Sequence, residues 1–321
     1  MKLSILHDEY FNEPTRSELR ALEAEVPGVT VVYCGQWDLT CVADLIDSEV
    51  VLGRIPPKML KELKNLKWHH LASAGANRFT DKSLYADPSI ILTKSSGTFG
   101  IPIAEHTLGM MLSLSRHFTD HYKNQLNGVW RQSWPVTYEL YDSNVLVLGL
   151  GDLGTEICKR LSGFGCHITG FRHDPSIPHE LVDEVRPISM LRESLPYADY
   201  IIVCLPGTDD TMKLIGREEF HLMKERAIVI NVGRGFIVDT DALVDALNNN
   251  LIAGAGLDVT DPEPLPPSHP LWYARNVIIT PHESATSSEV GKRRLVIFTD
   301  LLKRYMNGQP MYNRVNFELG Y

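Results

Sequence analysis

Three polar side chains, Arg234, Glu263 and His282, each follow an apolar, strand-like segment in the C-terminal half of the chain. An arginine guanidinium can hold a carboxylate through two parallel hydrogen bonds. A histidine imidazole can give a proton to a carbonyl oxygen, and a neighbouring carboxylate favours the imidazolium that carries this proton. Each residue alone has an ordinary structural explanation. Together the three suit the reduction of a carbonyl group in an anionic substrate.

A glycine-rich turn supplies the second chemical signal. The apolar residues 145–148 are followed by Gly149-x-Gly151-x-x-Gly154 and then by apolar side chains at helical spacing. In such a turn the first glycine permits the sharp change of direction. The second lets the backbone approach a pyrophosphate, and the third lets the helix pack closely. Because the helix N-terminus then offers free N–H groups to the phosphates, the pattern predicts dinucleotide binding.

Parallel sheets are expected to position these residues, because strand-like and helix-like segments alternate along the chain. The chain of 321 residues is also too long for one ordinary core. We predict an α/β protein with two Rossmann-like, doubly wound parallel-sheet domains and an active-site cleft between them. Residues 1–99 and 289–321 would form a discontinuous substrate-binding domain, and residues 100–288 the dinucleotide-binding domain. The expected strands are residues 3–6, 29–33, 50–52, 68–71, 145–148, 167–171, 200–204, 227–231, 253–257 and 277–279, and the expected helices are residues 18–25, 57–63, 103–125, 155–164 and 289–305.

These motifs make the chain resemble the D-isomer-specific 2-hydroxyacid dehydrogenase family, in particular its glyoxylate/hydroxypyruvate reductases, along nearly its whole length. The resemblance is carried by residues 149–154, 205–224, 231–235, 255–266 and 276–282. It implies an NAD(P)-dependent oxidoreductase that reduces a small 2-oxo acid to the D-2-hydroxy acid by hydride transfer. Glyoxylate, hydroxypyruvate, pyruvate and bulkier 2-oxo acids all remain open as the substrate.

The resemblance also implies roles for individual residues. Arg234 would bind the substrate and take part in catalysis, His282 would bind it and donate the proton, and Glu263 would be the partner of His282. Backbone N–H groups of Ser73, Ala74 and Gly75 would hold the substrate carboxylate. Arg54 and Trp134 could line the substrate pocket, but each could equally lie on the surface or in the core. The cofactor-binding residues would be Gly149, Gly151, Asp152, Leu153, Gly154, Arg172, His173, Leu205, Pro206, Val232, Gly233 and Asp258.

The residue after the second cofactor strand bears on the choice of nucleotide. NAD-selective sites carry a carboxylate there, which accepts hydrogen bonds from the ribose 2′-hydroxyl. This chain has Arg172 and then His173, and an arginine can pair with a 2′-phosphate. We therefore predict a preference for NADP, with dual use of NAD as the alternative. Asp174 leaves open a loop shift that returns a carboxylate to the ribose, and Glu283, beside His282, has no explanation from the sequence.

Composition limits the partners and the compartment. The net charge of −9 argues against a nucleic-acid partner. No apolar run is long enough for a membrane helix, and the N-terminus lacks the apolar core of a signal peptide. Five cysteines without a C-x-x-C pair favour reduced thiols and a cytoplasmic protein. No metal site is expected, because H-E-x-x-H is missing and the neighbours His69 and His70 would face opposite sides of a strand.

Assembly and a non-enzymatic alternative complete the expectations. The predicted helix 103–125 is apolar nearly all round, so it must be buried in a core or at a subunit interface. Family resemblance favours a homodimer with this region at the interface. Some family members are NAD(H)-sensing corepressors, and a binding protein of that kind without significant turnover is the alternative. The acidic charge and the lack of tails weaken that reading.

Overall fold

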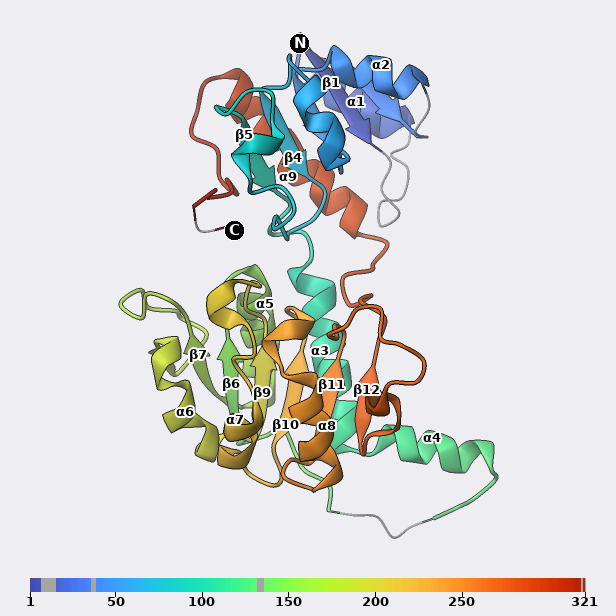
Figure 1. The fold of residues 1–321 in the computed structure, drawn as a ribbon, viewed down its shortest axis with the longest axis vertical. Helices are drawn as coiled ribbons and strands as arrows, with labels where there is room; N and C mark the ends of the chain where they lie inside the picture. The colour runs from blue at the N-terminus through green and yellow to red at the C-terminus, as the bar shows by residue number, and fades with distance from the viewer. Residues whose placement is uncertain (7–15, 36–38, 132–135, 319, 321) are drawn as a thin grey trace. The chain divides into compact units, whose positions relative to one another are not determined.

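The computed structural model describes residues 1–6, 16–35, 39–131, 136–318 and 320 (Figure 1). Trp134 lies outside these residues. The chain divides into two compact units, Met1–Phe99 with Thr286–Tyr321 and Gly100–Ala285, called unit 1 and unit 2 below. Each unit is built on one parallel sheet with helices, so the predicted α/β fold class is confirmed.

Unit 1 contains a five-stranded sheet in the order β2-β1-β3-β4-β5, with every pair parallel. Successive residues of β3 face opposite sides. Val50 and Leu52 join the apolar cluster that includes Leu22 of α1 and Phe298 of α9, whereas Val51 joins the cluster on the other face. The strands are β1 Lys2–Leu6, β2 Thr30–Cys34, β3 Val50–Leu52, β4 Trp68–Leu71 and β5 Ile91–Lys94, and the helices are α1 Arg16–Glu25, α2 Leu39–Ile46 and α9 Val290–Met306, with short 3₁₀ turns at Pro57–Glu62 and Lys82–Leu84.

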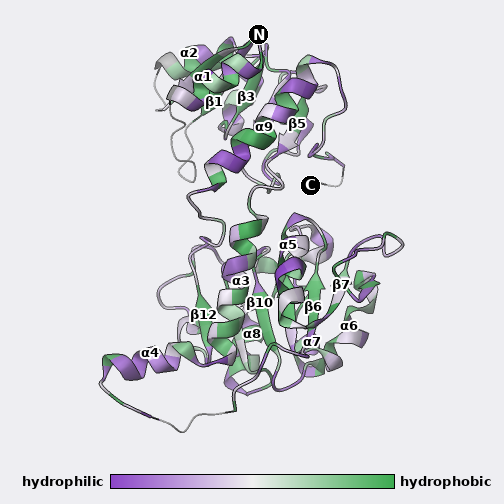
Figure 2. Ribbon diagram, turned by 180° about the vertical axis from the view of Figure 1, so that it is seen from behind, coloured by the Kyte–Doolittle hydropathy of each residue, from purple (hydrophilic) through white to green (hydrophobic). Residues whose placement is uncertain are grey.

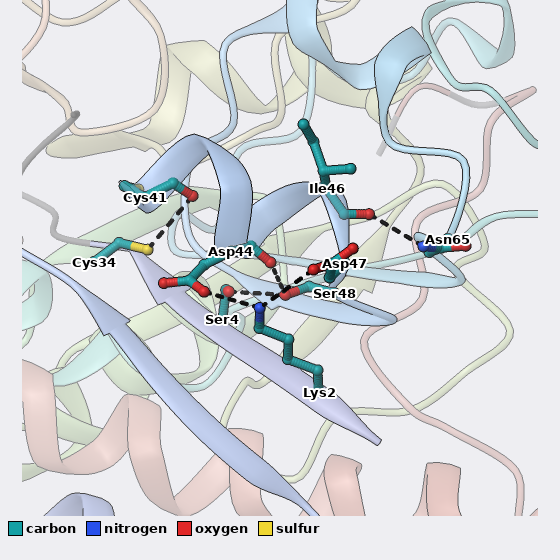
Figure 3. Close-up of polar contacts among 9 residues, drawn as sticks. All are labelled: Lys2, Ser4, Cys34, Cys41, Asp44, Ile46, Asp47, Ser48 and Asn65. Carbon is teal, nitrogen blue, oxygen red and sulfur yellow. Dashed lines mark hydrogen bonds and ion pairs between the residues drawn. The ribbon is translucent and has the colours of Figure 1, made fainter. Parts of the chain in front are cut away.

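Polar contacts fix the end of α2 against β1 (Figure 3). The hydroxyl of Ser4 lies 2.8 Å from that of Ser48 in the interior. Ser48 also donates to the backbone carbonyl of Asp44, and the Lys2 ammonium pairs with the Asp44 carboxylate at 2.8 Å. The buried hydroxyls are thus satisfied by each other and by the end of the helix, as buried polar groups need to be.

Unit 2 contains a seven-stranded parallel sheet in the order β12-β11-β10-β9-β6-β7-β8. The chain adds strands outward from β6 in one direction (β7, β8) and then outward from β9 in the other, so the strand order reverses between β6 and β9. Ligands of such sheets bind beyond the carboxyl ends of the strands near that point. The central strands are buried on both faces and read as continuous apolar runs (Figure 2). The strands are β6 Asn144–Leu148, β7 His167–Phe171, β8 Glu184–Arg186, β9 Tyr200–Val203, β10 Ile228–Asn231, β11 Gly254–Leu257 and β12 Val277–Ile279, and the helices are α3 Gly100–Ser115, α4 Phe118–Leu126, α5 Asp152–Leu161, α6 Leu191–Ser194, α7 Arg217–Leu222 and α8 Thr240–Asn248.

The prediction of one helix over residues 103–125 is wrong, because the chain forms α3 and α4 with a break between them. His117 adopts a left-handed conformation at φ 55° and starts α4. The apolar positions that bury α3 stop at Leu114, and α4 has no buried residue. Without core packing after Leu114, nothing keeps the two segments in one straight helix. Most of α3 is buried within unit 2, where it packs against α5 and the sheet.

Two further features concern the described residues as a whole. In these parts of the chain, no helix is both long and apolar enough to cross a bilayer. Nor do they contain a group of three or more His, Cys, Asp or Glu side chains able to hold a metal ion. None of the five cysteines forms a disulfide bond, and three of them are buried.

Candidate active site

The glycine-rich turn joins β6 to α5 in the predicted strand–turn–helix form. Gly149 has φ 107° and donates its N–H to the Phe171 carbonyl at 2.9 Å. A Cβ at Gly149 would lie 2.9 Å from the Cys204 carbonyl oxygen, and one at Gly154 would clash with the Gly149 carbonyl oxygen. A Cβ at Gly151 would meet no atom within 4 Å. The turn is therefore tight on its inner side and open at the N-terminus of α5, which fits the approach of a phosphate.

Asp152 and Leu153 begin α5 and are partly exposed. The other expected cofactor residues lie on loops that follow neighbouring strands. Leu205 and Pro206 come after β9, and Val232 and Gly233 after β10. These loops touch, since a Cβ at Gly233 would lie 2.9 Å from the Leu205 carbonyl oxygen. Both loops are at the same carboxyl edge of the sheet as the glycine turn.

Arg172 follows β7 directly, on the other side of β6. Its backbone N–H donates to the Arg186 carbonyl, and its guanidinium donates to the Ile177 carbonyl at 3.4 Å. His173 is exposed. The carboxylate of Asp174 accepts from both the backbone N–H and the hydroxyl of Ser176, and these bonds hold the pKa of Asp174 below its usual range. Asp174 is thus engaged within its own turn.

Arg234 is held by the buried side chain of Asn231, the last residue of β10. The Asn231 amide nitrogen donates to the Arg234 carbonyl at 2.9 Å, and its oxygen accepts from the Gly233 N–H at 3.0 Å. The Arg234 guanidinium donates to the Gly233 carbonyl at 2.7 Å. Burial lowers the pKa of Arg234, whereas the carboxylate of Glu263 opposes this change. The turn after β10 therefore fixes the arginine near an anionic partner.

Glu263 and His282 form the second part of the constellation. His282 Nδ1 lies 2.7 Å from Glu263 Oε1, and both side chains are a little under half exposed. An ionised carboxylate only accepts, so Nδ1 carries the proton of this bond. No described residue is bonded to the opposite ring nitrogen, Nε2, which remains available for a ligand. The structure therefore brings together the three side chains on which the sequence prediction depends.

The loop that carries His282 is fastened to Asp258, the residue after β11. His282 donates its backbone N–H to the Asp258 carbonyl at 2.8 Å. The N–H groups of Glu283 and Ser284 donate to the two oxygens of the Asp258 carboxylate at 2.9 and 3.0 Å. Asp258 is 2% exposed and so is engaged mainly with the protein. The backbone of Glu283 is thus one of the groups that fasten the loop to Asp258, while its side chain is exposed.

Ser73, Ala74 and Gly75 belong to unit 1 and follow β4. The Ser73 hydroxyl donates to the Gly75 carbonyl at 2.7 Å, and the Ser73 carbonyl accepts from the Ser95 N–H at 3.0 Å. The loop is therefore ordered by its own bonds, and its contact with a substrate stays a prediction. Arg54, after β3 in the same unit, is exposed.

Sequence reasoning did not single out three residues that are hydrogen-bonded to the loops of this site: Asn231, Thr280 and His106. Asn231 and Thr280 lie inside the motifs of residues 231–235 and 276–282, and the signal that could have found them is a polar side chain at the end of an apolar strand. His106 lies in the apolar helix α3, and its spacing carries no signal. Its partner becomes visible only in the fold.

A large cavity lies at the opposite edge of the sheet. Its volume is about 1300 Å³, and it is lined by the first residues of two strands, Ile228 of β10 and Val277 of β12, together with Lys123 of α4. Arg234 and His282 follow the carboxyl ends of these same strands. The cavity is therefore separate from the candidate active site.

Comparisons with known proteins identify the family of the chain. The family model described as D-isomer specific 2-hydroxyacid dehydrogenase, NAD binding domain, matches residues 108–284, more than half of the chain. A D-3-phosphoglycerate dehydrogenase of Methanocaldococcus jannaschii is 33% identical over 276 residues. These residues cover 84% of this chain and 52% of the relative, so the chain spans about half the length of that protein. A glyoxylate reductase of Aeropyrum pernix is 35% identical over 242 residues, which cover 72% of this chain and 70% of the relative.

A solved structure matches the whole fold. It is a D-isomer specific 2-hydroxyacid dehydrogenase from Xanthobacter autotrophicus Py2 in complex with NADPH and MES. The TM-score is 0.82 at 26% sequence identity, and the match covers 99% of both chains. The similarity therefore includes both units.

Proposed function

The chain belongs to the D-isomer specific 2-hydroxyacid dehydrogenase family, as its motifs predict, and we propose that it reduces a small 2-oxo acid with NADPH. Family membership makes it an NAD(P)-dependent oxidoreductase. The finer proposal is that the substrate is of the glyoxylate, hydroxypyruvate or pyruvate kind and that the product is the D-2-hydroxy acid. The single observation that carries it is the 2.7 Å contact between His282 and Glu263, with Arg234 close enough for its charge to interact with that carboxylate.

Each of the three side chains has one role in the proposed reaction. The Arg234 guanidinium binds the substrate carboxylate and orients the carbonyl group. His282 then donates the proton on Nε2 to the carbonyl oxygen as negative charge develops there. Glu263 accepts a hydrogen bond from the Nδ1–H group, which keeps the imidazole ring oriented and stabilises its charged form before the transfer. The bound nicotinamide supplies the hydride.

The nucleotide would be held by the turn at Gly149, Gly151 and Gly154 and by the loops after β9 and β10. The preference for NADPH rests on Arg172, whose guanidinium is bonded only weakly, at 3.4 Å, to the Ile177 carbonyl. Asp174 supports the same preference, because its carboxylate is turned toward Ser176, whose two donors both bond to Oδ1. The relative from Xanthobacter autotrophicus was solved with NADPH. Use of NADH as well is the main alternative.

We also propose a homodimer. Because α3 is mostly buried within unit 2, the evidence for an interface comes from α4. Phe118, Tyr122 and Leu126 of α4 are each more than half exposed, and Trp130 just beyond it is 90% exposed. Large apolar side chains gathered on one segment mark an interaction surface. A mass near 72 kDa by light scattering at micromolar concentration is expected from a chain of 36.1 kDa. A mass of one chain would contradict this part of the proposal.

The compartment is a separate point. Five cysteines that form no disulfide bond favour a reducing compartment such as the cytoplasm.

A panel of 2-oxo acids, each assayed with NADPH and with NADH, tests the proposed activity. Glyoxylate, hydroxypyruvate, pyruvate and a bulkier 2-oxo acid should include at least one that is turned over rapidly. The variant His282→Ala should lose kcat by orders of magnitude and keep nucleotide binding. Binding of nucleotide without turnover of any member of the panel would refute the proposed reductase and favour a nucleotide-sensing protein. Unchanged turnover in His282→Ala would refute the role of this histidine.

A further inference from the structure

The loop of His282 depends on an unusual arrangement of donors. Three consecutive backbone N–H groups, those of His282, Glu283 and Ser284, all donate to Asp258. His282 itself has φ 57°, a left-handed conformation that residues other than glycine seldom adopt. The loop can keep this conformation only while Asp258 presents its oxygens in the right direction. The Asp258 backbone carbonyl thus holds His282 itself, and the orientation of the Asp258 carboxylate constrains the two residues that follow it in the turn.

Thr280 and His106 set that orientation from a second side. The Thr280 hydroxyl lies 2.6 Å from Asp258 Oδ1, and His106 Nε2 lies 3.0 Å from the same hydroxyl. A hydroxyl has one proton, and an ionised carboxylate can only accept. Thr280 must therefore donate to Asp258, which leaves its oxygen as the acceptor for His106. His106 Nε2 carries a proton, and the chain of bonds runs in one direction from His106 through Thr280 to Asp258.

His106 removes the rotational freedom of the Thr280 hydroxyl. Because the oxygen accepts from Nε2, its own proton can point only toward Asp258. The histidine comes from helix α3, which is buried against α5 and the sheet, so its backbone is firmly placed. It is also close to the buried carboxylate, with Nε2 4.0 Å from Asp258 Oδ1. The bonded chain thus connects a rigid helix to a loop whose own conformation is strained.

We infer that His106 is a positioning residue, which acts through Thr280 and Asp258 to hold the loop of His282 in its left-handed turn. The inference rests on the proposed function, in which His282 is the proton donor. Neither His106 nor Thr280 touches the substrate in this account. Loss of the chain of bonds lets the carboxylate turn, releases the N–H groups of Glu283 and Ser284, and moves the imidazole away from its place beside Glu263.

Two pairs of variants separate the hydrogen bond from the volume of the side chain. His106→Phe keeps a ring but has no donor, whereas the amide of His106→Gln can donate to the same hydroxyl. Thr280→Val removes the hydroxyl at nearly constant shape, and Thr280→Ser keeps it. We expect His106→Phe and Thr280→Val to lower kcat at least tenfold while the Kd for NADPH stays within twofold. His106→Gln and Thr280→Ser should remain within threefold of the wild type.

The double variant His106→Phe/Thr280→Val tests whether the two residues act as one chain. If they do, the kcat of the double variant should be within twofold of that of the less active single variant, because the second change removes nothing further. A matched control is His221→Phe, since among the described residues the His221 ring bonds only to the Arg217 carbonyl within its own helix α7. Multiplicative losses in the double variant, or a loss confined to the Kd for NADPH, would overturn the inference.

Amide hydrogen exchange gives a measure that does not require turnover. The N–H groups of Glu283 and Ser284 should exchange at least tenfold faster in His106→Phe and in Thr280→Val than in the wild type, and at wild-type rates in His106→Gln. If no 2-oxo acid is reduced by the wild type, the proposed function fails while the exchange rates still decide this inference. Unchanged exchange in both His106→Phe and Thr280→Val would overturn it. In an active enzyme, a kcat within twofold of wild type in those variants would do the same.

Discussion

Two buried histidines should make unit 1 sensitive to mild acid. His69 and His70 are neighbours in β4 and have no exposed surface. Burial lowers the pKa of His69 to about 4. Burial, the charge of Arg294 and the neighbouring His69 lower the pKa of His70 to about 3. In an unfolded chain both have a pKa near 6.5, so the unfolded state binds their protons first.

The hydrogen bonds of His70 show why a second proton on its imidazole is unfavourable. Ser95 donates its hydroxyl proton to the Leu71 carbonyl, so its oxygen accepts from His70 Nε2 at 3.1 Å. Thr93 accepts from the Trp68 indole and lies 2.6 Å from His70 Nδ1, to which it therefore donates. The neutral imidazole is fully satisfied in this arrangement. A proton on Nδ1 would face the Thr93 hydroxyl proton and break the network.

The sign and size of the effect follow from these values. Between pH 6.5 and the folded pKa, each histidine takes up its proton in the unfolded chain alone, so the free energy of unfolding falls as the pH falls. One pKa unit corresponds to about 1.4 kcal/mol. At pH 5.0 each histidine therefore lowers the free energy of unfolding by about 2 kcal/mol, and the two together by about 4 kcal/mol. Asp199 has a pKa below its usual range, so its contribution is lost only at still lower pH.

Urea unfolding followed by circular dichroism at pH 7.5, 6.0, 5.5 and 5.0 measures this loss. Between pH 6.0 and 5.0 the free energy of unfolding should fall by about 2.5 kcal/mol, and by about half as much in His70→Gln. The matched control His221→Gln changes an exposed histidine and should leave the slope as it is. A slope below about 1 kcal/mol per pH unit in the wild type, or an unchanged slope in His70→Gln, would refute the reasoning.

The fold could be predicted where burial dictates composition. Strands β6 and β9 are buried on both faces, so they had to be continuous apolar runs. Strand β8 was missed because only three residues pair at the edge of the sheet, two of them charged. Strand β5 was missed because it is only four residues long, two apolar residues followed by two polar ones, which is neither an apolar run nor an alternation. In both cases the pairing partner, not the segment itself, makes the strand.

Part of the candidate site could be predicted because topology does the positioning. In a parallel sheet, residues after neighbouring strands must meet at one edge, which is why Glu263 and His282 could be expected to come together. No such rule predicts the residues whose hydrogen bonds hold the loops of the site. Asn231 binds backbone groups whose direction depends on the turn it stabilises. His106 meets Thr280 across 174 residues of sequence, and no local pattern in α3 points to that contact.

The same reasoning gives three expectations for single residues of the site. Arg234→Lys should lower kcat/KM by about 2–4 kcal/mol of transition-state binding, because an ammonium cannot form the two parallel hydrogen bonds of a planar guanidinium; near-normal efficiency would remove Arg234 from the site. Arg172→Asp should raise the KM for NADPH strongly and preserve use of NADH; a wild type that prefers NADH would refute this role. Asn231→Asp is the sharpest, because it keeps the acceptor for the Gly233 N–H but sets a carboxylate oxygen against the Arg234 carbonyl, where an N–H now donates at 2.9 Å. Since the side chain is 1% exposed, water cannot replace the lost donor, and a loss of about 1–3 kcal/mol is expected in both stability and kcat/KM. Asn249→Asp, which removes a similar amide-to-carbonyl bond at an exposed helix end, should change neither. Equal kcat/KM for Asn231→Asp and the wild type would mean that this turn does not position the arginine.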